Sequence, residues 1–402
     1  MTTQAEARAE PAPLELSDAL RMEARTAIVN RLGELVCWPT SRIPPYERQL
    51  AADILVGLLR TSRADLRARV ALGLAAIHDA PKALLRYLAR DDINVSQPLI
   101  VDGIGFDDSD LIATVRAGVA AHWHAIARRK TLSEAVVDAL VQTNETPVIE
   151  TLLKNSGARF SAQAVDMAVA RSRAAPALCA PLIARPELRP TQALVLFWWC
   201  GAEARHAILK RYPVDRSVLI ESLGEVFALA AQEGWADAET RKALQLIERR
   251  QRNREAATRS VHGSLEGAAL RAEAGLDTQL MNEIAHLAGV KPQTAVQIFS
   301  DPGGEPIAVL AKATGLKRNF VTSIWKGLRR PLGDADNPDT AYGRTMMAFE
   351  MLSTAKAQTV LRYWNWSFSA DAAAGIQLLD DDIGDEIDFL PAQRNAALLL
   401  RR

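Results

Sequence analysis

The sequence has little of what a β-sheet needs. Aromatic residues make up only 5% of the 402 residues, and runs rich in Val, Ile, Thr and Tyr are almost absent. Those residue types pack well on a pleated sheet, whereas the Ala and Leu that dominate this chain favour helices. The composition therefore predicts an all-α protein.

Cysteine, net charge and long apolar runs are also scarce. Three widely spaced cysteines, Cys37, Cys179 and Cys200, show no pairing pattern, which indicates a reducing cytosol rather than a disulfide framework. Lys plus Arg and Asp plus Glu both number 48, so no net charge steers the whole chain onto nucleic acid, although a local patch still can. No stretch approaches the roughly 18 apolar residues of a membrane helix, and the N-terminus has no signal-peptide pattern. These absences predict a cytoplasmic protein.

Motifs for nucleotide phosphates, metals and nucleophilic catalysis are missing as well. Neither G-x-x-x-x-G-K-[ST] nor G-x-G-x-x-G occurs, and no Cys/His spacing fits zinc. His122 and His124 flank Trp123, but alternate residues of a helix point about 200° apart and cannot hold one metal ion. Acids at 91–92 and 107–110 precede predicted helices, where negative charge is favourable without a metal. We predict no catalytic residue, no cofactor and no metal.

The chain does contain a loose period of short amphipathic helices. Successive candidate hairpins begin at Thr131, Ser161 and Pro190, about 29 to 30 residues apart, and apolar residues recur in them at helical spacing, as at Val148 and Leu152. Such hairpins cannot bury their apolar faces alone, and stacking them gives a continuous core. The pattern predicts an α-solenoid, with a non-repetitive helical bundle as the alternative.

Residues at the predicted helix ends agree with this pattern. Ser109, Ser133 and Ser161 are predicted N-caps, because a serine hydroxyl can accept a hydrogen bond from a free N–H of the first turn. Pro147 and Pro190 lie at helix starts, where the missing N–H of proline costs little.

Two segments in this region resemble a known bacterial family. They are "LLRYLARDDINVSQPLIVD" and "GVAAHWHAIARRKTLSEAVVDALVQTNETPVIETLLKN". The shared features are the Asp-Asp before a helix, the "HAIARR" segment and the Asn-bearing "TNETPVIETLLKN" hairpin, and the similarity extends from about Glu47 to Arg330. The family is catalogued only as a domain of unknown function. The resemblance implies HEAT-like α-helical repeats and supplies no catalytic residue, since a fold does not fix a function.

Composition changes along the chain predict its domain layout. The stretch 236–264 is densely charged and loses its apolar residues, so we place a boundary between 250 and 270. The end is acidic, with seven acids against three arginines between residues 370 and 402, as in an interaction tail. The predicted segments are a partly disordered leader with one helix (1–45), a HEAT-like repeat domain (46–250), a helical module (270–330), and a C-terminal helix, predicted at 344–364, with the acidic tail (340–402).

The module contains two segments that resemble helix-turn-helix units. "HLAGVKPQTAVQIF" and "LAKATGLKRNFVTSIWKGL" each place a helix before Gly289 or Gly315, then a turn, then a second helix. Residues 279–330 hold seven basic residues and three acids, a net charge of +4. A DNA reader needs phosphate contacts and polar residues that reach base edges. The candidate nucleic-acid contacts are Lys317, Arg318, Asn319, Lys326, Arg329 and Arg330.

We expect the protein to be a non-enzymatic helical-repeat scaffold or adaptor in bacterial signalling or regulation. Solenoids present extended surfaces, and a chain without a catalytic constellation normally uses them to bind a protein partner. Trp123, Trp199 and Trp235 are candidate anchors. The alternative is a transcription regulator that binds DNA through 279–330, and a HEAT-like DNA glycosylase is a remote third reading. We also hypothesise that the acidic tail at 370–402 masks the basic patch of the module.

Overall fold

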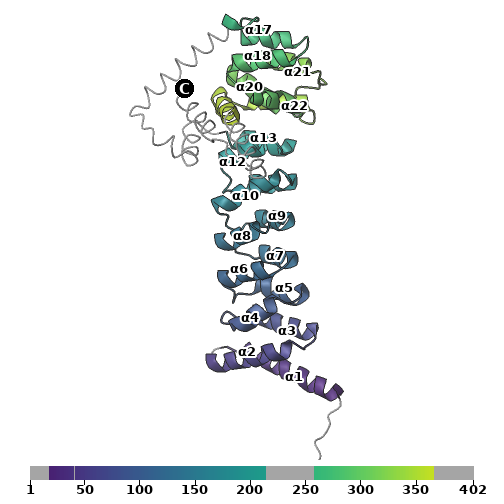
Figure 1. Cartoon of the computed structure of the whole chain (residues 1–402), viewed down its shortest axis with the longest axis vertical. Helices are drawn as coiled ribbons and strands as arrows, with labels where there is room; N and C mark the ends of the chain where they lie inside the picture. Colours follow the sequence, from purple (N-terminus) through teal and green to yellow (C-terminus); the bar gives the residue numbers. More distant parts are fainter. Residues whose placement is uncertain (1–17, 40, 214–257, 366–402) are drawn as a thin grey trace, which may run out of the picture. The chain divides into compact units, whose positions relative to one another are not determined.

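The computed structural model describes residues 18–39, 41–213 and 258–365, which form helices joined by short turns (Figure 1). These ranges contain no strand, and their β-type pairing is limited to an isolated bridge between Leu132 and Ala158. The prediction of an all-α protein is confirmed. No helix in the same ranges is long and apolar enough to cross a membrane.

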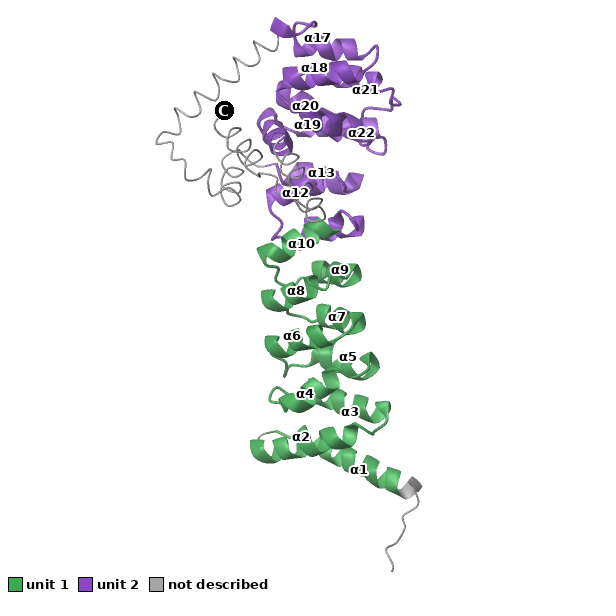
Figure 2. Cartoon of the chain, in the orientation of Figure 1, with its two compact units in different colours: residues 1–171 green, residues 172–402 purple. Residues whose placement is uncertain are grey.

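The chain divides into two compact units, unit 1 (residues 1–171) and unit 2 (residues 172–402), coloured separately in Figure 2. The division falls inside the predicted repeat domain of 46–250. The charged stretch at 236–264 lies largely outside the described residues, and the acidic tail at 370–402 lies wholly outside them.

Unit 1 consists of short helices separated by turns, as the repeat pattern predicts. Its helices are α1 (Asp18–Val36), α2 (Pro45–Leu59), α3 (Ala64–Ala75), α4 (Lys82–Ala89), α5 (Ile93–Asp102), α6 (Asp108–Ala117), α7 (Ala120–Ala127), α8 (Glu134–Val141), α9 (Thr146–Lys154) and α10 (Ala162–Ser172), which ends at the boundary.

The helices α1 to α9 stack in two layers. Each odd-numbered helix packs on the next odd-numbered one, and α2, α4, α6 and α8 pack on one another in the same way. Large side chains fill the space between the layers, with Leu55, Leu74, Leu84 and Leu88 fully buried in one cluster. Burying a leucine side chain contributes about 1.5–3 kcal/mol, so no single hairpin holds this core without its neighbours. The α-solenoid stays a prediction.

The helix caps agree with two of the three serines predicted. Ser133 accepts a hydrogen bond from a first-turn N–H of α8, and Ser161 accepts one at the start of α10. The prediction for Ser109 is wrong, because Asp107 caps α6 in a reciprocal capping box with Asp110. Ser109 instead donates to Asp107 (2.6 Å), and this hydrogen bond helps to hold the pKa of the Asp107 carboxyl well below its ordinary value.

Unit 2 begins with two further hairpins and continues with the predicted module. Its elements are the 3-10 turn η1 (Pro176–Leu178), α11 (Cys179–Ala184), α12 (Pro190–Leu196), α13 (Ala202–Arg211), α17 (Leu265–Ala272), α18 (Thr278–Ala288), α19 (Pro292–Ser300), α20 (Glu305–Thr314), α21 (Arg318–Gly327) and α22 (Ala341–Met351), with a further helix over 354–365. The single helix predicted over 344–364 is wrong. Leu352 has an extended backbone (ψ 134°) that ends α22, and the next helix starts two residues later.

The two helix-turn-helix-like segments have the same local geometry. Gly289 after α18 and Gly315 after α20 both adopt the left-handed conformation, with φ of 70° and 81°. In each case the residue after the glycine donates its N–H back to a carbonyl of the preceding helix. The sequence similarity of the segments therefore reflects a repeated helix end.

Replacing Gly315 by alanine is expected to destabilise unit 2 by about 1–2 kcal/mol, because an L side chain is strained at a φ of +81°. An added Cβ meets nothing within 4 Å, so the cost comes from the backbone alone. The same change at Gly57, inside α2 and equally open, is expected to stabilise by about 0.5–1 kcal/mol. Urea unfolding measures both, and effects of the same sign at the two sites would contradict the explanation.

Candidate functional site

Three of the predicted nucleic-acid contacts lie together on the surface of unit 2. Lys317 is the N-cap residue of α21, Arg318 begins the helix, and Asn319 follows; all three are exposed. This end of a second helix is where a helix-turn-helix reader contacts bases. However, the Arg318 guanidinium lies 3.7 Å from the Glu350 carboxylate of α22, so an acid accompanies the basic group.

The other three predicted contacts lie at the opposite end of α21. Lys326 is nine residues beyond Lys317, about 13 Å along a helix axis, and its ammonium pairs with Glu273 at 2.8 Å. Arg329 is exposed, whereas Arg330 packs its guanidinium over the Trp325 ring and donates to a backbone carbonyl. Burial lowers the pKa of Arg330. The six residues therefore do not form one continuous basic surface.

The predicted tryptophan anchors are only partly available. Trp123 is half-buried and donates its indole N–H to the carbonyl of Val115 at 2.7 Å. Trp199 is half-buried and donates to the Ser172 hydroxyl at 2.9 Å. Trp235 lies outside the described residues. As binding anchors, all three stay predictions.

A groove of about 630 Å³ opens in unit 2 between α13, α21, α22 and the loop before α22. Three methionines of α22 line it and are called its floor here: Met347 is 37% exposed, Met351 is half-buried, and Met346 is 1% exposed. The sequence signal for this floor was the segment "RTMMAFEML", since three of the seven methionines of the chain gather there. Methionine clusters make adaptable apolar surfaces.

The rim of the groove carries charges of both signs. His206 and Lys210 stand one turn apart on α13, both exposed, and neither makes an ion pair with a described residue. Arg318 lies on the α21 side. Asp336 of the loop and Glu350 of α22 supply negative charge. The groove thus combines an apolar floor with a mixed polar rim.

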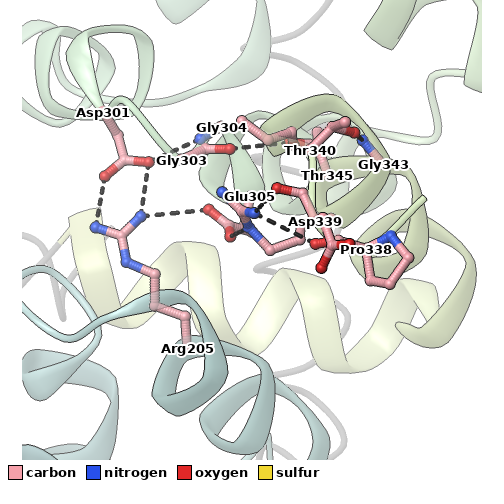
Figure 3. Close-up of polar contacts among 12 residues, drawn as sticks. Arg205, Asp301, Gly303, Gly304, Glu305, Pro338, Asp339, Thr340, Gly343 and Thr345 are labelled. Atoms are coloured by element: carbon pink, nitrogen blue, oxygen red, sulfur yellow. Dashed lines mark hydrogen bonds and ion pairs between the residues drawn. The ribbon is translucent and has the colours of Figure 1, made fainter. Parts of the chain in front are cut away.

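A buried ionic network holds the groove-forming helices together (Figure 3). Arg205 of α13 binds both carboxylate oxygens of Asp301 (2.8 and 2.9 Å), and it donates to Glu305 at 3.3 Å. It also donates to the carbonyl of Cys200 (3.1 Å) and lies over the Phe197 ring. Burial alone would lower the pKa of Arg205, but the hydrogen bonds and charges of the two acids outweigh it and raise the pKa.

The second half of the network reaches the loop beside the groove. Glu305 also pairs with Arg344 of α22 (3.4 Å), whose guanidinium donates to the backbone carbonyls of Pro338 and Asp339. These contacts tie α22, the helix that carries the three methionines, to the loop before it. The network therefore positions three walls of the groove from one buried centre.

A tight turn completes this centre. Asp301 accepts from the N–H of Gly304 (2.9 Å), and Thr345 donates to the carbonyl of Gly303 (3.2 Å). Gly304 has a φ of +83°, and an added Cβ would come within 2.2 Å of the Trp325 ring. The "DPGGEP" segment, which the sequence marks only as a turn, is thus the part of the module that receives Arg205.

The two neighbouring histidines of unit 1 make separate contacts. His122 is buried with its Nε2 2.8 Å from the carbonyl of Asp91, and the Nε2 of His124 lies 3.0 Å from the Thr151 hydroxyl. Across the described ranges, no three His, Cys, Asp or Glu residues gather as a metal site would require.

A family model described as "Uncharacterised protein conserved in bacteria" (DUF2336) matches residues 95–362 of the chain. Comparison with curated proteins and with solved structures finds no match. The matched residues include the groove, the buried network and the part of unit 1 from residue 95 onward.

Proposed function

This chain belongs to the DUF2336 family of uncharacterised bacterial proteins, and we propose that it is a cytoplasmic, non-enzymatic adaptor built from HEAT-like hairpins that binds a protein partner. The partner offers an amphipathic segment. Its apolar side chains lie on the methionine floor of the unit 2 groove, and its acidic groups face His206 and Lys210.

The observation that carries this proposal is the combination of floor and rim. Met347 and its neighbours provide an apolar surface that can repack around different side chains. The unpaired Lys210 and His206 favour acids on the partner, while Asp336 and Glu350 reject a uniformly negative ligand. A protein segment meets both conditions.

The same rim argues against the alternative of a DNA reader at 279–330. Phosphate contacts dominate DNA affinity, and carboxylates beside Arg318 and Lys326 oppose them. The exposed start of α21 favours the DNA-binding alternative. A DNA-binding titration therefore separates the adaptor from the DNA reader.

Replacing Met347 by glutamate is expected to reduce capture of the partner at least tenfold, because a charge then lies on the apolar floor. The measurement is photo-crosslinking from a position in the groove of the full chain in its own cells. The matched control is Val296→Glu on α19, which is 53% exposed and does not line the groove.

Two results would contradict the adaptor proposal. One is a crosslinked set that is the same for Met347→Glu, Val296→Glu and the unchanged chain. The other is binding to mixed duplex DNA with a steep salt dependence that disappears in a Lys317/Arg318/Lys326 to alanine variant, which would establish the DNA reader instead. Repeating the titration without residues 370–402 tests the hypothesis that the acidic tail masks the patch.

A further inference from the structure

Four arginines of unit 1 converge on a second groove, of about 550 Å³. Arg60 follows α2, Arg67 lies on α3, and Arg86 and Arg90 come from the last turn of α4 and the residue after it. Tyr87 lies between the last two. In the sequence these arginines fall in three separate helical stretches, so nothing in the sequence shows that they meet.

Only part of this positive charge is neutralised. Arg67 binds the two carboxylate oxygens of Asp91 (2.5 and 2.9 Å), and Arg86 uses its Nε to bind the buried Asp110 (2.7 Å). The Nη groups of Arg86 form no hydrogen bond with a described residue. Arg60 and Arg90 are exposed and likewise form no ion pair within the described ranges.

Hydrogen bonds hold the side chains of Arg67 and Arg86 in place. Arg67 donates as well to the carbonyl of Ser62 (2.7 Å), which ties α3 to the turn after α2. Asp110 is 0% exposed and also binds Lys82 at 2.6 Å, so the carboxylate that holds Arg86 is itself fixed. The free Nη edge of Arg86 is therefore preorganised, whereas Arg60 and Arg90 line the groove without a side-chain hydrogen bond to a described residue.

We propose that this groove binds a phosphorylated side chain on a segment of a partner protein. Three guanidinium edges, those of Arg60, Arg86 and Arg90, are available to one ligand, and a phosphate dianion has three terminal oxygens to accept from them. A carboxylate has only two oxygens and a single negative charge, so it satisfies these three groups less fully. The groove is larger than a phosphate group, which leaves room for the flanking peptide, and Arg suits such planar recognition better than Lys.

The local acids limit the site to one phosphoryl group. Asp91 lines the groove itself, and Asp92 is exposed beside it. A nucleic-acid backbone needs a continuous line of cations, which these acids interrupt. The site is separate from the methionine-floored groove, and the proposal does not depend on it.

The test uses the full chain and a pool of peptides with a central phosphoserine between randomised residues. We expect binding that weakens with salt and falls at least tenfold in an Arg60→Ala/Arg90→Ala variant. Arg63→Ala/Arg69→Ala is the matched control: it removes the same charge from exposed arginines that do not line the groove, and its affinity should stay unchanged. Arg60→Lys/Arg90→Lys keeps the charge and should still lose affinity, because the guanidinium fork is gone.

Several outcomes would overturn the proposal. These are equal binding of the unphosphorylated pool, no binding of the phosphorylated pool, an equal loss in the Arg63/Arg69 control, and tighter binding of mixed single-stranded DNA than of the phosphopeptides. Because Arg60 and Arg90 are exposed, the urea midpoint of their variants should match that of the unchanged chain, which separates lost binding from lost folding.

Discussion

Replacing Arg205 by methionine is expected to destabilise unit 2 by about 3–5 kcal/mol, the usual result of removing one partner from a buried ion pair. Arg205 is 7% exposed, and its two acids, Asp301 and Glu305, are 6% and 3% exposed. Methionine fills much of the same space, so the loss comes mainly from leaving the carboxylates without their cation. Gly304 N–H and Arg344 compensate only in part.

Urea unfolding of the full chain, followed by tryptophan fluorescence, measures this loss. The matched control is the triple variant Arg205→Met/Asp301→Asn/Glu305→Gln, which removes the charges together and should recover most of the stability. A loss below about 1 kcal/mol for the single variant would show that the network does not hold the module to α13.

Trp364→Ala is expected to cost about 3–5 kcal/mol, as large-to-small changes of buried aromatic residues do. Trp364 is 0% exposed, its ring centroid lies 5.0 Å from that of Phe197 and 4.7 Å from that of Trp198, and its N–H donates to the carbonyl of Leu194 at 3.0 Å. The substitution removes this packing and leaves the carbonyl unpaired. The helix over 354–365 then loses its main attachment to the α12 hairpin.

Unfolding experiments on two variants separate packing from hydrogen bonding. Trp364→Phe keeps most of the buried area and removes only the donor, so its cost should be about 1–3 kcal/mol. Hydrogen exchange should also speed up over 354–365 in Trp364→Ala more than in Trp364→Phe. If Trp364→Ala unfolds at the same urea concentration as the unchanged chain, the helix is not anchored there.

Both variants test the same attachment in unit 2. Arg205 joins the module to the α12–α13 hairpin through Asp301, 96 residues away in sequence, and Trp364 joins the helix over 354–365 to the same hairpin through Leu194, 170 residues away. The module predicted as a separate segment at 270–330 therefore shares its interior with hairpins of the predicted repeat domain. Its groove exists because α13 packs against α22.

The local structure was accessible to sequence reasoning because its causes are local. Apolar residues spaced three and four apart define the buried face of a helix. A glycine after such a pattern marks a helix end, and Gly289 and Gly315 do end α18 and α20. The two local predictions that were wrong concern positions where neighbouring residues compete for the same structural role. Asp107, and not Ser109, is the N-cap residue of α6. At Leu352 the backbone becomes extended and ends α22, although the apolar pattern continues through this position.

The sequence by itself determined that the chain is helical and where most of its helices begin and end. It also determined that several basic residues cluster around Arg318. Only the tertiary structure decided which charges remain available. Arg205 forms an ion pair with Asp301, and Lys326 forms one with Glu273. Arg60 and Arg90 form no ion pair with a described residue. The physical reason is distance: helical periodicity relates residues within two turns, whereas an ion pair depends on which helices pack side by side.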